Sequence, residues 1–172
     1  MSVTLSQLKK SLKIEYDYDD NELLRLRDAV VDLIGKYTGM LMYVSKKTQY
    51  LPYFMRTRLT GVPFHEINSV KYTDSSGTVQ TMAATDYFID RTCEPSIFIN
   101  FLEYPSIKEG TFVEVEYKCG MILFDKSIEQ LVISMVGSWY NNPEAVQPIG
   151  LSTVPLSAQF ILDQYKVQGD LE

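Results

Sequence analysis

The segment from Asp125 to Pro143 constrains the fold more than any other stretch of this chain. Its apolar residues recur at three- and four-residue spacings, which is typical of an α-helix with one broad face against a core. We expect Asp125 or Ser127 to cap the helix, because a short side-chain oxygen can accept a hydrogen bond from its first amide groups. Pro143 ends it, because proline has no amide proton to continue the ladder. The apolar residues are Ile128, Leu131, Val132, Met135, Val136 and Trp139.

Two further helices are predicted at the N-terminus. Thr4 followed by Gln7 is a capping box, and it opens a short helix with Leu5, Leu8 and Leu12 on one face. A longer helix is expected from about residues 19–21 to residue 38, followed by Gly39 in a left-handed C-terminal cap. Its buried side would comprise Leu23, Leu26, Val30, Leu33, Ile34 and Tyr37.

Between these helices and the central one, residues 43–119 alternate apolar and polar residues, which is typical of half-buried strands. The clearest strand places Val113, Val115 and Tyr117 on one face. About six short strands separated by turns indicate an antiparallel sandwich or small barrel. The sequence therefore predicts an α+β fold, in which a bundle of about four helices carries an inserted antiparallel β subdomain.

The chain after the central helix is predicted to be an arm. Residues 143–155 contain three prolines, and loops of this length in a compact domain are usually functional or flexible. A last helix is expected from Leu156 to Lys166, with apolar residues on more than one face, which favours contact with a partner. The alternative is that it packs only on its own bundle. We thus divide the chain into an N-terminal helical part (1–42), a β-rich insertion (43–119), the central helix (120–142) and the arm with its C-terminal helix (143–172).

Charge and composition limit the classes of function. The 172 residues carry a net charge of −6 without any basic run, which disfavours binding to nucleic acid through its phosphates. No apolar run approaches the roughly twenty residues of a spanning helix, and the N-terminus does not resemble a secretory signal. These features predict a cytosolic product. The twelve tyrosines and eight phenylalanines fit either surfaces buried on assembly or simply a tyrosine-rich sheet.

The residues that carry chemistry are few. His65 is the only histidine, which excludes a multi-histidine metal site and leaves little basis for a catalytic triad. Cys93 and Cys119 are 26 positions apart and form no CxxC motif, so we expect free thiols rather than a zinc or redox site. No phosphate-binding glycine loop or nucleophile elbow occurs. We therefore expect no enzymatic activity and no cofactor, with a small acidic hydrolase using Cys119 or His65 as the alternative.

The densest acidic cluster begins at Asp17 and ends at Glu22. It lacks the glycine that a calcium-binding loop requires, so we interpret it as a helix start with solvated carboxylates rather than as a metal site. Glu114 and Glu116 are expected on the solvent-exposed face of a strand rather than as the two catalytic carboxylates of a glycosidase.

Four motifs in order resemble the head–tail connector (adaptor) proteins of long-tailed bacteriophages. Residues 3–39 combine a short leucine-bearing helix, an acidic hinge of the type D-x-D-D and a long helix that ends in Tyr-Thr-Gly. VEVEYKCGM, with Tyr117 and Gly120, resembles the strand of that family ending in Tyr-x-x-Gly. IEQLVISMVGSWYNNPE resembles the next helix, although Pro143 stands where the family has arginine. LSAQFILDQYK resembles the closing helix, with Lys166 in place of arginine.

The resemblance covers both ends of the chain and most of its helical frame, whereas the β region matches only in type. It implies a structural virion protein that forms a ring, commonly a dodecamer, beneath the portal in the neck of a tailed phage. Such a ring joins the portal to the stopper or tail-completion protein and lets DNA pass without specific binding. The protein would be made in the host cytoplasm. Another neck protein, a stopper or tail terminator, is the alternative.

We expect the last turn of the central helix and the C-terminal helix to contact partner proteins. An apolar helix on a flexible arm suits a segment that docks into a partner and becomes ordered on binding. The predicted interface residues are Trp139, Tyr140, Asn142, Pro143, Phe160, Ile161, Leu162, Tyr165 and Lys166.

Overall fold

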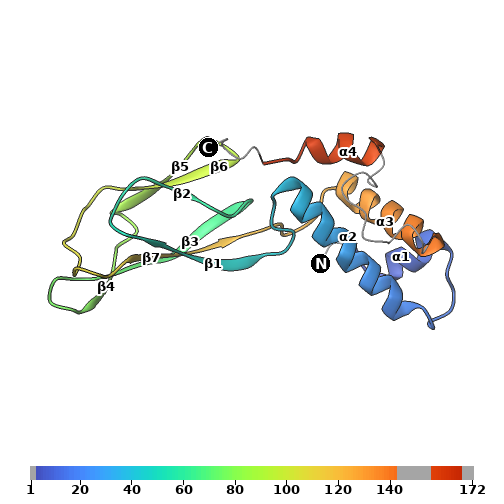
Figure 1. Ribbon diagram of the computed structural model, residues 1–172, viewed down its shortest axis with the longest axis horizontal. Coiled ribbons are helices and arrows are strands. Elements are labelled where there is room, and N and C mark those ends of the chain that lie inside the picture. Colours follow the sequence, from blue (N-terminus) through green and yellow to red (C-terminus); the bar gives the residue numbers. More distant parts are fainter. Residues whose placement is uncertain (1–2, 143–155, 168–172) are drawn as a thin grey trace. The chain divides into compact units, whose positions relative to one another are not determined.

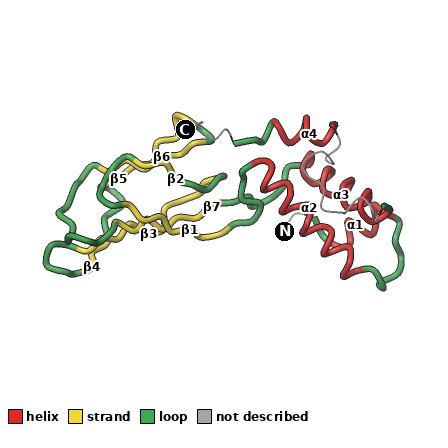
Figure 2. The backbone as a smooth tube through the Cα atoms, in the orientation of Figure 1, coloured by secondary structure: helices red, strands yellow, loops and turns green. Residues whose placement is uncertain are grey.

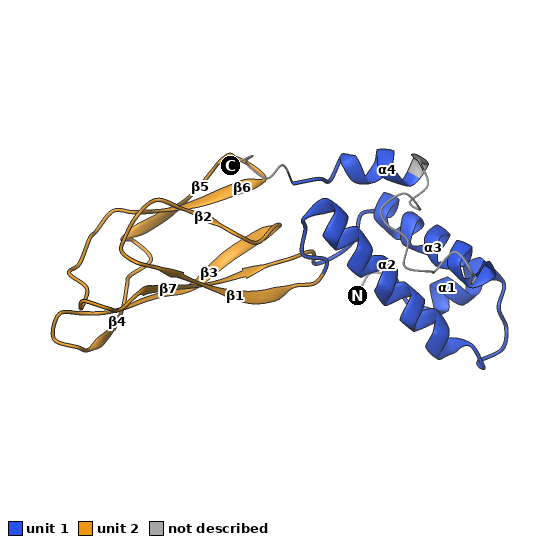
Figure 3. Cartoon of the chain, in the orientation of Figure 1, with its two compact units in different colours: residues 1–42, 122–172 blue, residues 43–121 orange. Residues whose placement is uncertain are grey.

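The computed structural model describes residues 3–142 and 156–167, which form four helices and seven strands (Figures 1 and 2). The chain divides into two compact units (Figure 3): a helical unit of residues 1–42 and 122–172, and a β unit of residues 43–121. The helical unit is thus discontinuous in sequence, and the β unit is inserted between its second and third helices. The predicted α+β class is confirmed.

The helical unit contains α1 (Leu5–Leu12), α2 (Asp20–Thr38), α3 (Lys126–Asn141) and α4 (Leu156–Asp163). Helix α2 packs mainly on α3, and both α1 and α4 contact these two helices. Helix α1 approaches α3 closely at Gly137, where an added Cβ atom would lie 2.7 Å from the Leu12 side chain. The apolar faces predicted for α2 and α3 supply most of the core, which includes Leu23, Leu26, Val30, Ile34, Ile128, Leu131, Val132, Met135 and Val136.

Helix ends agree with the sequence at α1, α2 and α3, except for the missing side-chain cap of α3, and differ at the end of α4. The capping box of Thr4 and Gln7 is present, and Gly39 adopts a left-handed conformation with φ +75°. Asp125 occupies the N-cap position of α3, one of the two predicted, but its side chain makes no capping hydrogen bond. Helix α4 ends at Asp163 instead of Lys166, because the chain tightens into turns and the Val167 amide donates to the Thr38 carbonyl at 2.8 Å.

The β unit consists of two antiparallel sheets that do not close into a barrel. Strands β1 (Ser45–Leu51), β7 (Val113–Cys119), β3 (Phe64–Thr73) and β4 (Val79–Thr81) form one sheet in that order. Strands β2 (Thr57–Leu59), β6 (Ser96–Phe101) and β5 (Tyr87–Cys93) form the other. The sandwich alternative is therefore the one realised, with seven strands in the described part of the chain.

Strand β7 is the centre of the β unit. Val113, Val115 and Tyr117 are completely buried, and the strand lies between β1 and β3, as its alternation predicted. The Tyr117 hydroxyl donates to the Gln49 side chain at 3.2 Å and accepts from the Thr60 amide at 3.2 Å. Because Gln49 belongs to the larger sheet and Thr60 follows β2 of the smaller one, these bonds link the two sheets.

The chain enters and leaves the β unit at adjacent points. Gly120 has φ +109°, and a Cβ atom there would lie 2.0 Å from the Tyr43 carbonyl oxygen. The Gly120 amide donates to the Pro63 carbonyl at 2.7 Å, and its carbonyl oxygen lies 2.6 Å from His65 Nε2. Only glycine fits this close crossing of the two backbones.

Candidate assembly surface

The end of α3 is joined to the turn between α1 and α2. The Tyr140 hydroxyl donates to Asp19 Oδ2 and lies 3.1 Å from the Tyr16 hydroxyl. These bonds raise the pKa of Tyr140. The largest cause is the hydrogen bond to the Asp19 carboxylate, which stabilises the protonated hydroxyl, and the hydrogen bond with Tyr16 comes second. The predicted interface residue Tyr140 therefore also closes the fold of the helical unit, whereas Trp139 is half-buried and Asn142 is exposed.

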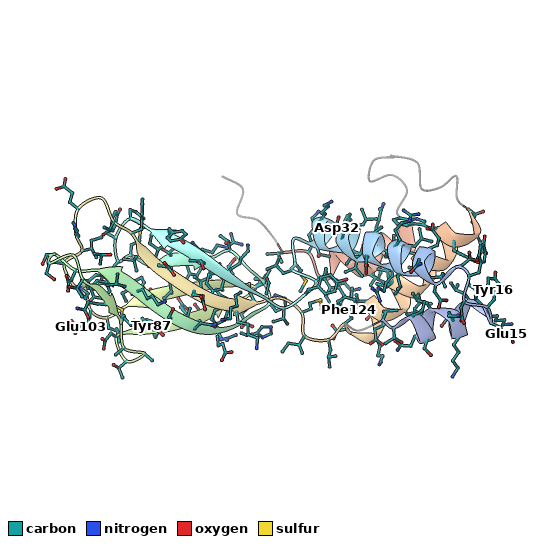
Figure 4. The ribbon with its side chains drawn as sticks, turned by 90° about the horizontal axis from the view of Figure 1, so that it is seen from below. Glu15, Tyr16, Asp32, Tyr87, Glu103 and Phe124 are labelled. Atoms are coloured by element: carbon teal, nitrogen blue, oxygen red, sulfur yellow. The ribbon has the colours of Figure 1, made fainter. Side chains whose placement is uncertain are left out.

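Tyr16 and Tyr18 make the α1–α2 turn aromatic. Tyr18 is 87% exposed, and its ring centroid lies 6.2 Å from that of Tyr16. Figure 4 shows the Tyr16 and Glu15 side chains at this turn of the helical unit. We call Tyr16, Tyr18 and Tyr140 the tyrosine surface. Sequence reasoning missed its first two members, since it treated that stretch only as an acidic hinge.

The acidic cluster beside the tyrosine surface is held largely in ion pairs. Lys9 contacts Asp17 at 2.5 Å and Asp20 at 2.8 Å, and Arg25 contacts Glu22 at 2.6 Å. The hydrogen bond and charge of Lys9 lower the pKa of Asp17. Across residues 3–142 and 156–167, no group of three or more histidine, cysteine or acidic residues is arranged to hold a metal ion. Within the same residues no helix is long and apolar enough to cross a membrane.

Helix α4 is attached to its own unit by three of the predicted interface residues. Leu162 is completely buried, so its side chain belongs to the core rather than to an exposed surface. The Tyr165 hydroxyl donates to Asp125 at 3.1 Å and lies 3.3 Å from the Ser127 hydroxyl. The two side chains expected to cap α3 thus hold Tyr165 instead.

Contacts with the end of α2 complete this attachment. The Tyr37 hydroxyl donates to Asp163 at 2.8 Å, and the Lys166 ammonium lies 5.3 Å from the centre of the Tyr37 ring. Lys166 therefore makes a cation–π contact within its own chain.

Phe160 is the apolar residue that α4 turns to solvent. Its side chain is 72% exposed, and the neighbouring Ile161 is partly exposed. Burial would remove apolar surface from water, so Phe160 suits a contact with another protein. Pro143, also predicted at the interface, lies outside the described residues.

The groups considered for hydrolysis do not form an activated pair. Cys119 is buried and its Sγ atom is 3.9 Å from the Ser45 carbonyl oxygen. Burial raises the pKa of the Cys119 thiol, which lowers the fraction of reactive thiolate. The His65 ring contacts the Gly120 carbonyl oxygen, and Cys93, the other free thiol, is exposed.

The fold defines a class: an α+β chain whose helical unit is interrupted by an antiparallel sandwich. No protein-family model and no curated protein matches the sequence. Several solved structures with a similar fold come from particles of a gene transfer agent (GTA). The chain is similar to "Neck of empty GTA particle computed with C6 symmetry", at 15% identity and a TM-score of 0.71, over 99% of this chain and 92% of that one.

Two further structures show the same likeness. A chain in the virion of a native GTA particle is 16% identical with a TM-score of 0.71, again over 99% and 92% of the two chains. A chain in the neck of a native GTA particle computed with C12 symmetry is 16% identical with a TM-score of 0.67, and the likeness covers 99% of this chain and 94% of that one. The likeness to these GTA neck and virion chains covers the fold of both units, including the β insertion.

Proposed function

We propose that this protein is a structural virion component, a head–tail connector (adaptor) that forms a ring in the neck of a phage-like particle. The single observation that carries the proposal is the likeness of fold over nearly the whole chain to neck chains of GTA particles. Both the helical unit and the β unit take part in it, which a chance likeness of one small bundle would not produce. The C6 and C12 symmetry of those necks favours a rotationally symmetric ring.

The adaptor would lie beneath the portal, join it to the stopper or tail-completion protein and let DNA pass through its channel. An acidic surface would avoid adhesion to the transported polyanion, and the net charge of −6 is consistent with this. A stopper or tail terminator has the same location in a neck and is the second candidate. An assembled channel lined by basic residues would count against the passive passage of DNA.

The contacts of α4 separate folding from partner binding. We propose Phe160 and Ile161 of α4, together with the end of α3 at Trp139, Tyr140, Asn142 and Pro143, as the partner-facing region. Leu162, Tyr165 and Lys166 would then act indirectly, by holding α4 in place. Deleting residues 156–172 would remove Leu162 from the core, so loss of binding by that truncation would have two explanations.

Point variants of α4 test the proposal more sharply. Phe160→Asp should bind purified portal at least roughly tenfold more weakly, because it places a charge in an apolar contact. Its urea unfolding midpoint should be nearly unchanged, since Phe160 is exposed. Leu162→Ala is the matched control: we expect a loss of about 2–5 kcal/mol in the free energy of unfolding. Full portal binding by Phe160→Asp would refute the assignment of α4 to the interface.

Assembly itself is tested by size-exclusion chromatography with light scattering and by negative-stain imaging, with and without portal. We expect rings that bind the portal; a stopper would instead bind only after an adaptor is present. A chain that stays monomeric and never binds the portal would overturn the proposal. The hydrolase alternative is eliminated if any hydrolytic activity is the same in the Cys119→Ala, His65→Ala double variant.

A further inference from the structure

The smaller sheet of the β unit exposes an apolar outer face. In β6, Ile97, Ile99 and Phe101 are buried, so the alternating residues Phe98 and Asn100 face away from the core.

The strand register extends this outer face across the sheet. Phe88 of β5 lies opposite Asn100, and Asp90 lies opposite Phe98. Phe88 is 49% exposed, and Leu102, which continues the outer row beyond β6, is 56% exposed. We call Phe88, Phe98, Asn100 and Leu102 the outer face of the smaller sheet.

One arginine and one aspartate at this outer face are paired within the chain. The Arg56 guanidinium lies 4.0 Å from the centre of the Phe98 ring and donates to Asp90 at 3.1 Å. Asp90 also accepts from the Thr92 amide at 2.9 Å and from its hydroxyl at 2.6 Å. Aromatic rings beside a paired arginine are typical of the residues that dominate protein–protein interfaces.

Asn100 carries a buried hydrogen-bond donor that has no partner. Within the described part of the chain, its Nδ2 atom is the one buried side-chain nitrogen or oxygen without a hydrogen-bond partner. A covered amide nitrogen without an acceptor costs free energy.

The distribution of charge indicates what docks there. The β unit has eight basic and nine acidic residues, whereas the rest of the chain has eight basic and thirteen acidic residues. Copies of an acidic protein repel one another, so they meet with the least penalty where charge is balanced. The outer face exposes Phe88 and Leu102, contains the paired Arg56 and Asp90, and belongs to the nearly neutral unit, so it is suited to contact with another copy of this chain.

We propose that, in the ring, the neighbouring copy of the same chain covers the outer face of the smaller sheet, with Phe88 and Leu102 at the contact. This rests on the proposed function, because it requires a ring. The contact is head-to-tail: copies repeated around one axis meet through two different surfaces, whereas a face that met itself would close a two-fold dimer.

The test compares neutral truncations of two exposed faces in the full chain. Phe88→Ser with Leu102→Ser should raise the protein concentration at which half of the chains are in rings by roughly tenfold or more. The control, Val79→Ser, removes a 66% exposed apolar residue of the other sheet and should leave that concentration unchanged. Both variants should keep the wild-type unfolding midpoint, because the replaced side chains are largely exposed.

Hydroxyl-radical footprinting of the wild type provides a second measurement. Oxidation of Phe88 and Leu102 should fall at least severalfold on assembly. Unchanged rings in the double variant, unchanged oxidation of both residues, or an equal loss in the Val79→Ser control would overturn this inference and leave the proposed function intact. A wild-type chain that forms no ring, alone or with portal, would overturn both.

Discussion

Single residues determine where the backbone of this protein can cross itself. Gly120 combines φ +109° with a backbone neighbour 2.0 Å from the position of a Cβ atom, whereas Gly110 has φ +79° and open space around it. The two glycines therefore separate the cost of an unfavourable backbone conformation from the cost of a steric clash.

We predict that Gly120→Ala destabilises the β unit by more than about 2 kcal/mol, because strain at positive φ adds to the displacement of the Tyr43 backbone. Gly110→Ala should cost only the strain, about 1 kcal/mol. Urea unfolding followed by tyrosine fluorescence measures both. Equal costs for the two variants would show that the close approach at Gly120 does not constrain the fold.

At the scale of elements, the turn between β3 and β4 is organised by one carboxylate. Asp74 accepts hydrogen bonds from the Ser76 amide at 2.9 Å, the Thr78 amide at 3.0 Å and the Gln80 side chain at 2.9 Å. The hydrogen bond from the Ser76 hydroxyl, together with those from Gln80 and the two backbone amides, lowers the pKa of Asp74 from 3.8 to about 2. The charged form is therefore favoured in the folded state.

This shift predicts a stability that depends on pH. Because the pKa of Asp74 is lowered on folding, its contribution is present above pH 3.8 and is lost as the pH falls through about 2. The free energy of unfolding should decrease less over this range in Asp74→Asn than in the wild type, with a modest difference because the carboxylate is exposed. Ser76→Ala should move the pKa of Asp74 upward in a carbon-13 NMR titration. An unchanged pKa would contradict the role given to the Ser76 hydroxyl.

The helical unit is held together by pairings between residues that are far apart in the sequence. Tyr165 reaches Asp125 across 40 positions of the sequence, and Tyr16 meets Tyr140 across 124. Local periodicity predicted the helices that carry these residues but could not show which side chains would meet. It assigned Asp125 to a cap and Leu162 to an interface, whereas Asp125 holds Tyr165 and Leu162 fills the core.

For the whole molecule, we propose that residues 43–121 fold as an independent domain. The β unit has its own core, and Tyr43 lies against Gly120, so its two ends are close together, as is common in inserted domains. A fragment of residues 43–121 should therefore unfold cooperatively in urea, with the near-ultraviolet circular dichroism of a packed core. A fragment without a cooperative transition would show that the β unit needs the helical unit to fold.

The sequence by itself determined the type and order of the elements, the buried face of β7 and most of the buried residues of α2 and α3, although Leu33 and Tyr37 of α2 are only half-buried. These depend on periodicity, caps and turn residues, which act over a few positions. It also carried the resemblance to head–tail connectors. The tertiary structure alone decided that the β region is a two-sheet sandwich, that Phe160 is exposed while Leu162 is buried, and that Asn100 lacks a partner on an apolar face. These features arise from contacts between residues far apart in the chain, because neighbouring elements, and not the local pattern, determine which side of a helix or sheet is covered.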